Sequence, residues 1–558
     1  MLPGFLPQLT ICVTNIRDHM EEPTHLTGPA NSALLFLKRP AVLFSMAFLV
    51  SSCIKISRLN SRELWLDETY SAFVANLHFS ELLRRTAGDV HPPLFYILLW
   101  IWTRIIGDAQ TQLRLFSVVL SIFSTFGMFV LGRQLLGPRF GVLAAALFAF
   151  SPMLFVYSLE VRMYMLTILV FICLLIVHWH VAIEQREAKW LLVLYGVLAA
   201  MLFYVHYIGV FLLAGLFMHW AIATRLSRVR VARFCFVGML TLLLVLPGIP
   251  LLLRQRAGKA RLDTAQRLSN QTQGSISFSA DEQKPSDLPG KKSIVKSVAA
   301  MAGFYPASSL PLLILWAVPL SVALAGVAYL ALVRGDQVCR LFGLVALSVG
   351  VGVVALRVNT TRHILPLVPI LAVALARVVQ YWAARVRLRS AGLIIGTLIL
   401  GLYVAGFFRQ AFVHHGRPWQ NLVGVVQQNY RPGDEVIFDV LYAQIPFDYF
   451  ARQVHFRAQE TGFPLSIYDW WDKQEFKGWG GPVIMQADLD RLALDIQAQR
   501  PNTIWLVLDE TYYYDPHNAL LARLRRLGQV DESRLPPDPD NPDAEGDESL
   551  HLFRLTLN

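Results

Sequence analysis

Long apolar runs are the feature that most limits how this chain can fold. A helix needs about 20 apolar residues to cross the hydrocarbon core of a bilayer, and twelve runs reach or approach that length. They cover residues 41–57, 91–106, 113–131, 140–157, 163–181, 190–205, 207–224, 234–253, 309–333, 340–356, 363–381 and 391–408. Because 55% of the residues are hydrophobic and only 16% are charged, we predict a polytopic α-helical membrane protein.

Basic residues between the runs predict the orientation of the chain, since loops rich in Lys and Arg stay on the cytoplasmic side. If all twelve runs crossed from a cytoplasmic N-terminus, the three most basic short loops would lie outside, namely residues 131–140, 225–233 and 382–390. These loops fall inside if the aromatic-rich residues 91–106 lie along the membrane surface. We therefore predict eleven spans and one juxtamembrane helix. The net charge of +11 then reflects topology, and no nucleic-acid partner is expected.

This topology brings the unusual polar segments of the chain to the outer face. They are residues 58–112, 157–164, 203–209, 254–308 and 356–365. Residues 1–40 are predicted to form a cytoplasmic tail and residues 41–409 the membrane domain. The Ser-, Gln- and Lys-rich residues 254–308 are predicted to form a mobile outer loop. The five cysteines are scattered, so neither a disulfide framework nor a zinc site is expected.

The composition changes after residue 409, where shorter patterns predict a small α/β domain on the outer side. Residues 434–440, 502–510 and 550–557 are typical of strands, and residues 487–500 and 517–528 are typical of helices. Trp470 and Trp471 either stack on a glycan or pack this domain onto the membrane domain. The domain has no Gly-rich phosphate loop.

Two adjacent carboxylates, Asp67 and Glu68, lie in the aromatic stretch "LWLDETYSAF" of the first outer loop. One interpretation is structural: a pair of solvated charges at the start of a helix, with Asp as the N-cap. The other is chemical, since a carboxylate at an apolar interface can act as a base. In "DVHPPLFY", the two prolines hold His91 in an extended conformation that can present its imidazole to an anion.

Two further motifs mark the outer ends of spans. "YSLEVRMY" contains Glu160, Arg162 and Tyr164, and its alternative interpretation is an exposed turn with a snorkelling Arg. "RVNTTRHILPL" places Arg362 and His363 on the side where the charge bias disfavours cations. A phosphate would explain these basic side chains. One ligand would account for the whole set: a lipid-linked phosphate with its tail among the spans.

Five stretches, "LWLDETYSAF", "HPPLFYILL", "LRLFSVVLS", "YSLEVRMYML" and "TRHILPLVP", occur in the order seen in bacterial protein-mannosyltransferase-like enzymes. Through these motifs, the region of residues 40–410 resembles membrane glycosyltransferases of the GT-C fold. These enzymes are related to the aminoarabinose transferases of lipid A. The resemblance implies an inverting transfer of a sugar from a polyprenyl-phosphate donor to an acceptor hydroxyl on the outer face of the inner or plasma membrane. It implies that an acidic residue of the first outer loop is the base.

The resemblance places Asp67 as the base, with Glu68 and Glu160 as helpers. It places His91 at the donor phosphate, where the chemistry also suits Arg162, Arg362 and His363. Weaker substrate contacts are predicted for Tyr70, Tyr164, His206 and Tyr207; for the last two, an aromatic belt is the favoured alternative. The adjacent "DE" lacks the DxD-like spacing of the metal-dependent oligosaccharyltransferase branch, so neither a metal nor a cofactor is predicted besides the lipid-linked donor.

Two other classes of function stay open. A transporter or flippase for lipid-linked sugars would need charged or broken segments in mid-membrane, whereas the spans here are polar mainly at their outer ends. A non-catalytic protein that binds polyprenyl-linked glycans would carry the same polar residues. The expected partners are a lipid-linked sugar donor, membrane lipids, and a glycan, lipid or protein as acceptor.

Overall fold

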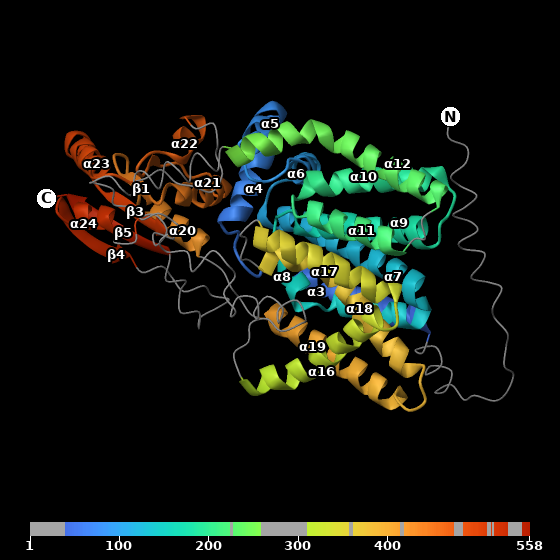
Figure 1. The fold of residues 1–558 in the computed structure, drawn as a ribbon. Helices are drawn as coiled ribbons and strands as arrows, with labels where there is room; N and C mark the ends of the chain where they lie inside the picture. Colours follow the sequence, from blue (N-terminus) through green and yellow to red (C-terminus); the bar gives the residue numbers. More distant parts are fainter. Residues whose placement is uncertain are drawn as a thin grey trace.

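The computed structural model describes residues 39–223, 227–257, 310–355, 361–412, 418–473, 484–509, 515, 518–533 and 550–557. The predicted tail, most of the loop 254–308 and part of 356–365 lie outside these residues. The apolar helices are α3 (Pro40–Ser57), α7 (Gln110–Ala149), α9 (Tyr164–His178), α10 (Lys189–Val205), α11 (Gly209–Ala223), α12 (Arg228–Val245), α16 (Leu310–Leu332), α17 (Gln337–Ala355), α18 (Val368–Ala383) and α19 (Arg389–Phe412). They form a bundle beside a smaller α/β body (Figure 1). The prediction of a polytopic helical protein is confirmed.

Helix α7 contains a reversal that separates two of the predicted spans. Gly137 has φ of 76° and ψ of 173°, so the helix breaks there, just before Pro138. Gly132 and Gly141 then lie back to back, because a Cβ atom on Gly132 would come within 2.9 Å of the Gly141 carbonyl oxygen. Only glycine permits both the positive φ and this close approach. Residues 110–136 and 138–149 therefore form two arms of a hairpin.

The predicted span 140–157 is wrong in one respect, because the chain breaks inside it. The second arm of α7 ends at Ala149, and a separate short helix, α8, covers Pro152–Ser158. Pro152 has no backbone N–H to continue the helical ladder. The side chain of Ser151 instead caps α8 by accepting a hydrogen bond from the Leu154 N–H, 3.4 Å away.

Residues 91–106 form helix α6 (Leu94–Ile105), which is too short to cross a membrane. Its 12 residues span roughly 18 Å at 1.5 Å per residue, against about 30 Å of hydrocarbon. It packs against α4 (Leu66–Asn76), and α5 (Phe79–Ala87) also contacts both helices. Among the described residues, seven helices have the length and apolar composition of membrane spans, and four shorter apolar helices, α6 among them, accompany these. The chain is a multi-pass membrane protein; the count of eleven spans stays a prediction.

The C-terminal body has a five-stranded sheet in the order β2-β1-β3-β5-β4. Its strands are β1 (Glu435–Asp439), β2 (Gln459–Gly462), β3 (Ile504–Asp509), β4 (Gly528–Ser533) and β5 (Leu550–Leu557). Strands β2, β1 and β3 are parallel, and β5 is antiparallel to β3 and β4. Its helices are α20 (Trp419–Asn429), α21 (Gln444–Gln453), α22 (Ile467–Lys473), α23 (Gln486–Gln499) and α24 (Ala519–Leu524). The predicted strands and helices are found, whereas β2, β4, α20, α21 and α22 were not predicted.

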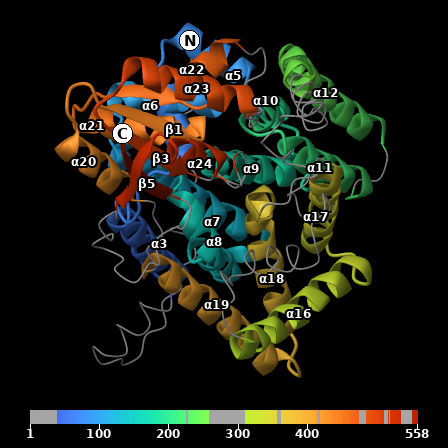
Figure 2. The same ribbon diagram turned by 90° about the vertical axis from the view of Figure 1, so that its left-hand side faces the viewer.

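The C-terminal body rests on helix α4 of the membrane domain (Figures 1 and 2). Helix α21 contacts α4. A shared apolar cluster includes Leu66 of α4 and Trp470 of α22, which is only 7% exposed. At the rim, Arg452 pairs with Asp108 at 2.9 Å, and the Tyr449 hydroxyl donates to the Asp108 carbonyl at 3.0 Å. The packing interpretation of Trp470 is confirmed, and the side chain of Trp471 lies outside the described residues.

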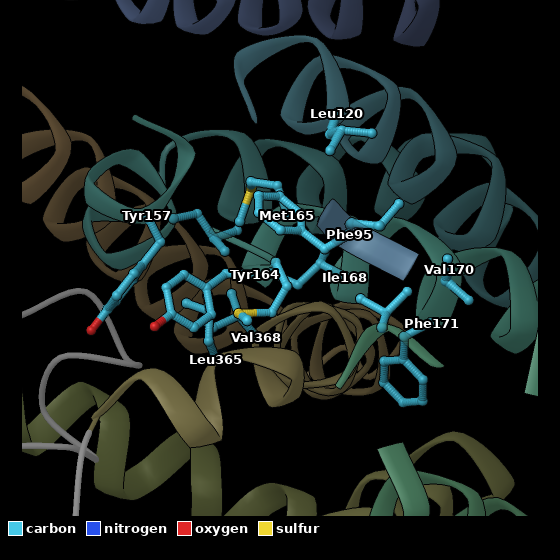
Figure 3. Close-up of a cluster of buried hydrophobic side chains, with 14 of the residues drawn as sticks. Phe95, Leu120, Tyr157, Tyr164, Met165, Ile168, Val170, Phe171, Leu365 and Val368 are labelled. Atoms are coloured by element: carbon cyan, nitrogen blue, oxygen red, sulfur yellow. The ribbon is translucent and has the colours of Figure 1, made fainter. Parts of the chain in front are cut away.

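A continuous apolar core packs the helices of the membrane bundle together. Figure 3 shows part of it, with Tyr164 and Ile168 of α9 close to Leu365, which precedes α18, and to Val368, its first residue. Residues 361–367 form a 3-10 turn rather than α-helix, because Pro366 and Pro369 cannot donate helical hydrogen bonds. This turn presents Arg362 and His363 beside the 157–164 turn instead of in line with α18.

Candidate functional site

Helix α4 presents Asp67 and Glu68 inward, and neither carboxylate is solvated. Asp67 is 2% exposed and Glu68 is 0% exposed. The N-cap of α4 is Trp65, whose backbone N–H donates to the Glu68 side chain at 3.3 Å. The interpretation of the pair as solvated charges with Asp67 as the cap is therefore wrong, because Glu68 performs the capping and both groups are buried.

Glu68 is held by a buried arginine from another helix. The Arg114 Nη2 of α7 lies 3.0 Å from Oε2, and the Arg114 Nε lies 3.4 Å from Oε1. The Val161 N–H donates to Oε1 at 3.0 Å. Arg114 is itself 0% exposed and donates to the backbone carbonyls of the loop before α4. Glu68 thus ties together α4, α7 and the 157–164 turn, and both of its oxygens are occupied.

Asp67 has a different environment, with cations on one oxygen and, among the described residues, no partner on the other. Its Oδ2 lies 3.1 Å from Nη1 of Arg362 and 3.8 Å from Nη2 of Arg162. Its Oδ1 is buried and has no hydrogen-bond partner among the described residues. Burying a carboxylate oxygen without a hydrogen-bond partner lowers the stability of the fold. This oxygen can accept a proton or a hydrogen bond from a hydroxyl group.

Arg162 is fully buried at the centre of this cluster. Its Nη1 lies 3.3 Å from the Asp67 carbonyl oxygen and 3.5 Å from both Ser71 Oγ and the Tyr96 hydroxyl. Its Nη2 lies 3.4 Å from His91 Nε2. Burial alone would lower the pKa of Arg162, but Asp67 and other nearby groups raise it well above its ordinary value. Arg162 is therefore a permanent positive charge beside Asp67.

Glu160 faces the loop that precedes α4. Arg62 Nη2 lies 3.7 Å from its Oε1. Burial raises the pKa of Glu160 to about 7, with Arg62 opposing the shift and Glu68 and Asp67 adding to it. A carboxylate that titrates near neutral pH suits acid–base chemistry.

Three histidines from separate segments form a row next to the two arginines. The ring centroids of His91 and His206 are 6.3 Å apart, and those of His206 and His363 are 5.8 Å apart, both edge to face. Burial and the neighbouring His363 and His91 lower the pKa of His206 well below its usual value. Asp89 lies 3.7 Å from Nδ1 of His91 and accepts a hydrogen bond from the Tyr96 hydroxyl at 3.2 Å.

The predicted tyrosines have different surroundings. Tyr70 packs edge to face on Tyr96, with centroids 6.2 Å apart. Tyr164 packs on Tyr157 at 5.1 Å, and Figure 3 shows both hydroxyls on the same side of the cluster. The Tyr207 hydroxyl donates to Gln255 Oε1 at 2.6 Å, and Gln255 in turn donates to the Thr86 carbonyl. Gln255 therefore links Tyr207 to Thr86 of α5.

The predictions missed Arg62, Arg114 and Asp89, which complete the cluster. Arg114 carried a signal in the sequence, because an arginine inside the apolar stretch "LRLFSVVLS" is expensive unless it is paired. Arg62 and Asp89 carried none, since each lies in a polar loop where charges are common.

The residues at this site do not resemble a metal-binding set. No group of three His, Cys, Asp or Glu side chains in the described parts of the chain could hold a metal ion. Two guanidinium groups already face Oδ2 of Asp67, and Arg114 occupies Glu68. A divalent cation would have to displace these cations. The absence of an essential metal stays a prediction.

Comparisons with known proteins agree with this architecture. A family model described as dolichyl-phosphate-mannose-protein mannosyltransferase matches residues 90–250. The crystal structure of ArnT from Cupriavidus metallidurans bound to undecaprenyl phosphate matches with a TM-score of 0.56 at 13% identity, covering 92% of this chain and 97% of that chain. Its apo state matches with a TM-score of 0.57 at 13% identity over the same shares. No curated protein matches at the sequence level.

A second group of solved structures shares the fold over a smaller share of its own length. The Archaeoglobus fulgidus oligosaccharyltransferase in complex with Zn and sulfate has a TM-score of 0.51 at 12% identity, covering 87% of this chain and 71% of that chain. The chain has the GT-C fold, and its predicted resemblance to the superfamily of protein-mannosyltransferase-like and aminoarabinose-transferase-like membrane glycosyltransferases is confirmed.

Proposed function

We propose that this protein is an inverting glycosyltransferase that moves a sugar from a polyprenyl-phosphate donor to an acceptor hydroxyl at the outer face of the membrane. The observation that carries the proposal is the Asp67 carboxylate, buried between Arg162 and Arg362 with Oδ1 open. This arrangement combines a proton acceptor with cations suited to a phosphate in one small volume. The family match and two structures bound to lipid phosphates support the donor class. These are ArnT with undecaprenyl phosphate and the Archaeoglobus fulgidus oligosaccharyltransferase, AglB, with an inhibitory peptide and a dolichol-phosphate.

Asp67 is the base in this proposal. The acceptor hydroxyl donates its proton to Oδ1 while its oxygen forms a bond to the anomeric carbon. The bond from that carbon to the phosphate oxygen breaks, and the electron pair leaves with the phosphate. Because a lipid phosphate is a good leaving group, the step needs cations near the phosphate and no general acid.

The donor phosphate is placed at Arg362 and the histidine row. The Arg362 side chain is 33% exposed, whereas that of Arg162 is only 2% exposed, so Arg362 is the cation that an incoming phosphate can reach. When the donor binds, the Arg362 side chain leaves its ion pair with Asp67 and contacts the phosphate. Because Asp67 then has one cation fewer beside it, it accepts a proton more readily. His91, His206 and His363 supply further donors, while Arg162 stays in place and orients Asp67.

Glu160 acts as a second carboxylate beside the reacting sugar. In its ionised form it stabilises positive charge that develops at the anomeric carbon, as in glycosidases. Glu68 is assigned a positioning role, since Arg114, Val161 and the helix cap occupy its oxygens. Asp67 differs from its neighbour Glu68 in having one carboxylate oxygen, Oδ1, without a partner among the described residues.

Replacing the base tests the proposal. Membranes from producing cells receive radiolabelled polyprenyl-phosphate sugars, and transfer of label into non-donor material is measured. Asp67→Asn should lower the transfer rate by about 10²–10⁴-fold, the usual contribution of a positioned base, while donor binding persists. Glu187→Gln, at a 91% exposed carboxylate, is the matched control and should leave transfer unchanged.

Three results would contradict the proposal in different ways. Transfer by Asp67→Asn at close to the wild-type rate would reject Asp67 as the base. Donor binding by the wild-type protein without transfer would favour a non-catalytic binding protein. Movement of intact donor across the bilayer would favour a flippase.

A labelling experiment tests the outer-face placement. Single cysteines are introduced at Asp108, beside α21, and at the exposed Ser227, which precedes α12, in a chain whose native cysteines are replaced by alanine. A membrane-impermeant maleimide should label the Asp108→Cys variant in intact cells and the Ser227→Cys variant only after lysis. The reverse pattern would overturn the topology.

A further inference from the structure

A cavity of about 720 Å³ lies between the first outer loop and the C-terminal body. One wall comes from the loop before α4 and the start of α7, including Arg62 and Thr111. The other wall comes from α20 and α21, including Asn421, Gly424 and Gln453. The volume is in the range of ligand pockets, about 300–1,000 Å³. Neither part of the chain forms this cavity alone.

The chemistry of the lining selects a ligand rich in hydroxyl groups. The side chains of Asn60, Gln420, Asn421 and Gln453 carry amides, and those of Ser61 and Thr111 carry hydroxyls. An amide offers both donors and acceptors, and so does a sugar hydroxyl. Among the described residues that line it, the charged ones are Arg62 and Glu63, one of each sign, which does not favour an anion. Most of the lining side chains are polar, and the apolar ones are Ala109, Val423, Phe450 and Val454.

Arg62 connects this cavity to the candidate catalytic cluster. It lines the cavity and also lies 3.7 Å from the Glu160 carboxylate. Glu160 in turn is electrostatically coupled to Asp67 and Glu68. Through Arg62 the cavity therefore reaches the Glu160 carboxylate of the cluster, whereas Arg162 and Arg362, the cations that suit the donor phosphate, do not line it.

We infer that this cavity is the acceptor subsite and that the acceptor is a glycan, held between the outer loop and helices α20 and α21. This inference rests on the proposed glycosyl transfer and adds to it the class of the acceptor and a role for the C-terminal body. The donor approaches from the membrane side and the acceptor from the aqueous side, and the two meet at the carboxylates.

Gly424 gives a way to fill the cavity without disturbing its walls. It lies within α20, and a Cβ atom added there meets no other atom within 4 Å. Larger side chains at this position therefore enter the cavity rather than the protein core. Gly424→Ala is the matched control, because it removes the helix-weakening glycine but adds only a methyl group.

The test compares Gly424→Ala, Gly424→Phe and Gly424→Trp with the glycan, lipid and protein fractions of the producing membranes as separate acceptors. The apparent KM for the glycan fraction should rise at least tenfold in Gly424→Trp, less in Gly424→Phe, and stay within twofold in Gly424→Ala. Slow hydrolysis of the donor by water should stay within twofold in all three variants. Glycan transfer by Gly424→Trp with an unchanged KM would overturn the inference, and so would label that enters only the lipid or protein fraction.

A binding measurement separates this inference from the proposed chemistry. In Asp67→Asn protein whose native cysteines are replaced by alanine, the added thiol of Gly424→Cys is labelled with a maleimide. The glycan fraction should slow this labelling at least threefold, although the protein transfers no sugar. The same fraction should not protect Gln529→Cys, at an exposed position on β4. Equal labelling with and without glycan would reject the subsite, whereas protection without transfer by the wild-type protein would reject only the proposed function.

Discussion

Asp67 and Glu68 are neighbours on the same turn of α4, yet they lie in opposite electrostatic situations. Glu68 has a fully buried arginine at 3.0 Å, a backbone N–H at 3.0 Å and its own helix cap. Asp67 has its cations on one oxygen and an open second oxygen. Two buried carboxylates of similar exposure can thus be distinguished by whether both of their oxygens have hydrogen-bond partners. A carboxylate whose oxygens are both paired stabilises the fold, and one with an unpaired oxygen is available for chemistry.

The largest expected effect is the loss of stability when Glu68, the fully paired carboxylate, is replaced. Glu68→Ala leaves Arg114 charged and buried without its carboxylate, and the loss of one partner from a buried pair costs about 3–5 kcal/mol. Chemical or thermal unfolding of the purified protein measures the change. Arg186→Ala removes an ion pair with a 57% exposed arginine and should change stability by at most about 1 kcal/mol.

Asp67→Asn should behave in the opposite way to Glu68→Ala. It removes the proton acceptor but keeps the size of the side chain, so the free energy of unfolding should change much less than in Glu68→Ala while transfer is lost. If Asp67→Asn unfolds as readily as Glu68→Ala, the distinction between a structural and a chemical carboxylate fails.

The fold was more predictable from the sequence than the hydrogen-bond partners of these two carboxylates. Apolar runs were enough to predict the membrane bundle, because burial depends on composition, and the short helix at residues 91–106 agrees with the prediction from the charged loops. The break at Pro152 and the reversal at Gly137 follow from backbone chemistry, although the first was missed. The partners of Glu68 come from residues 46 and 93 positions away in sequence, Arg114 and Val161. No local pattern around "DE" carries that information.

The next effect concerns the donor side of the cluster. Arg362→Gln removes a charge that we assign to the phosphate, and a hydrogen bond to a charged group contributes about 1.5–3 kcal/mol. The donor KM should therefore rise by roughly 10–100-fold, with Arg362→Lys intermediate. Arg385→Gln, at an arginine that stacks on Tyr381 in α18 away from the site, is the control. An unchanged donor KM in Arg362→Gln would move the phosphate to another cation.

A smaller effect is expected from pH. The pKa of Glu160 is raised to about 7 by burial, so this group is protonated below that pH and ionised above it. If the ionised form stabilises the reacting sugar, the transfer rate should rise several-fold between about pH 6 and pH 8. Glu160→Gln should be slower and should lack this rise. A Glu160→Gln profile that keeps the same rise would assign the titration to another group.

The smallest expected effect is that of removing divalent metal. This experiment tests whether the unpaired oxygen of Asp67 is a proton acceptor or a metal ligand. A bound Mg²⁺ or Ca²⁺ needs carboxylate oxygens at about 2.0–2.6 Å, but the Asp67 Oδ2 faces two guanidinium groups and Glu68 is saturated. EDTA should therefore change the transfer rate by less than about twofold, and added Mg²⁺ or Mn²⁺ should not raise it. If EDTA abolishes transfer and Mg²⁺ restores it, the open Oδ1 is a metal ligand rather than the base. Asp67 would then owe its reactivity to a cation that displaces Arg362, and Glu160 would become the leading proton acceptor.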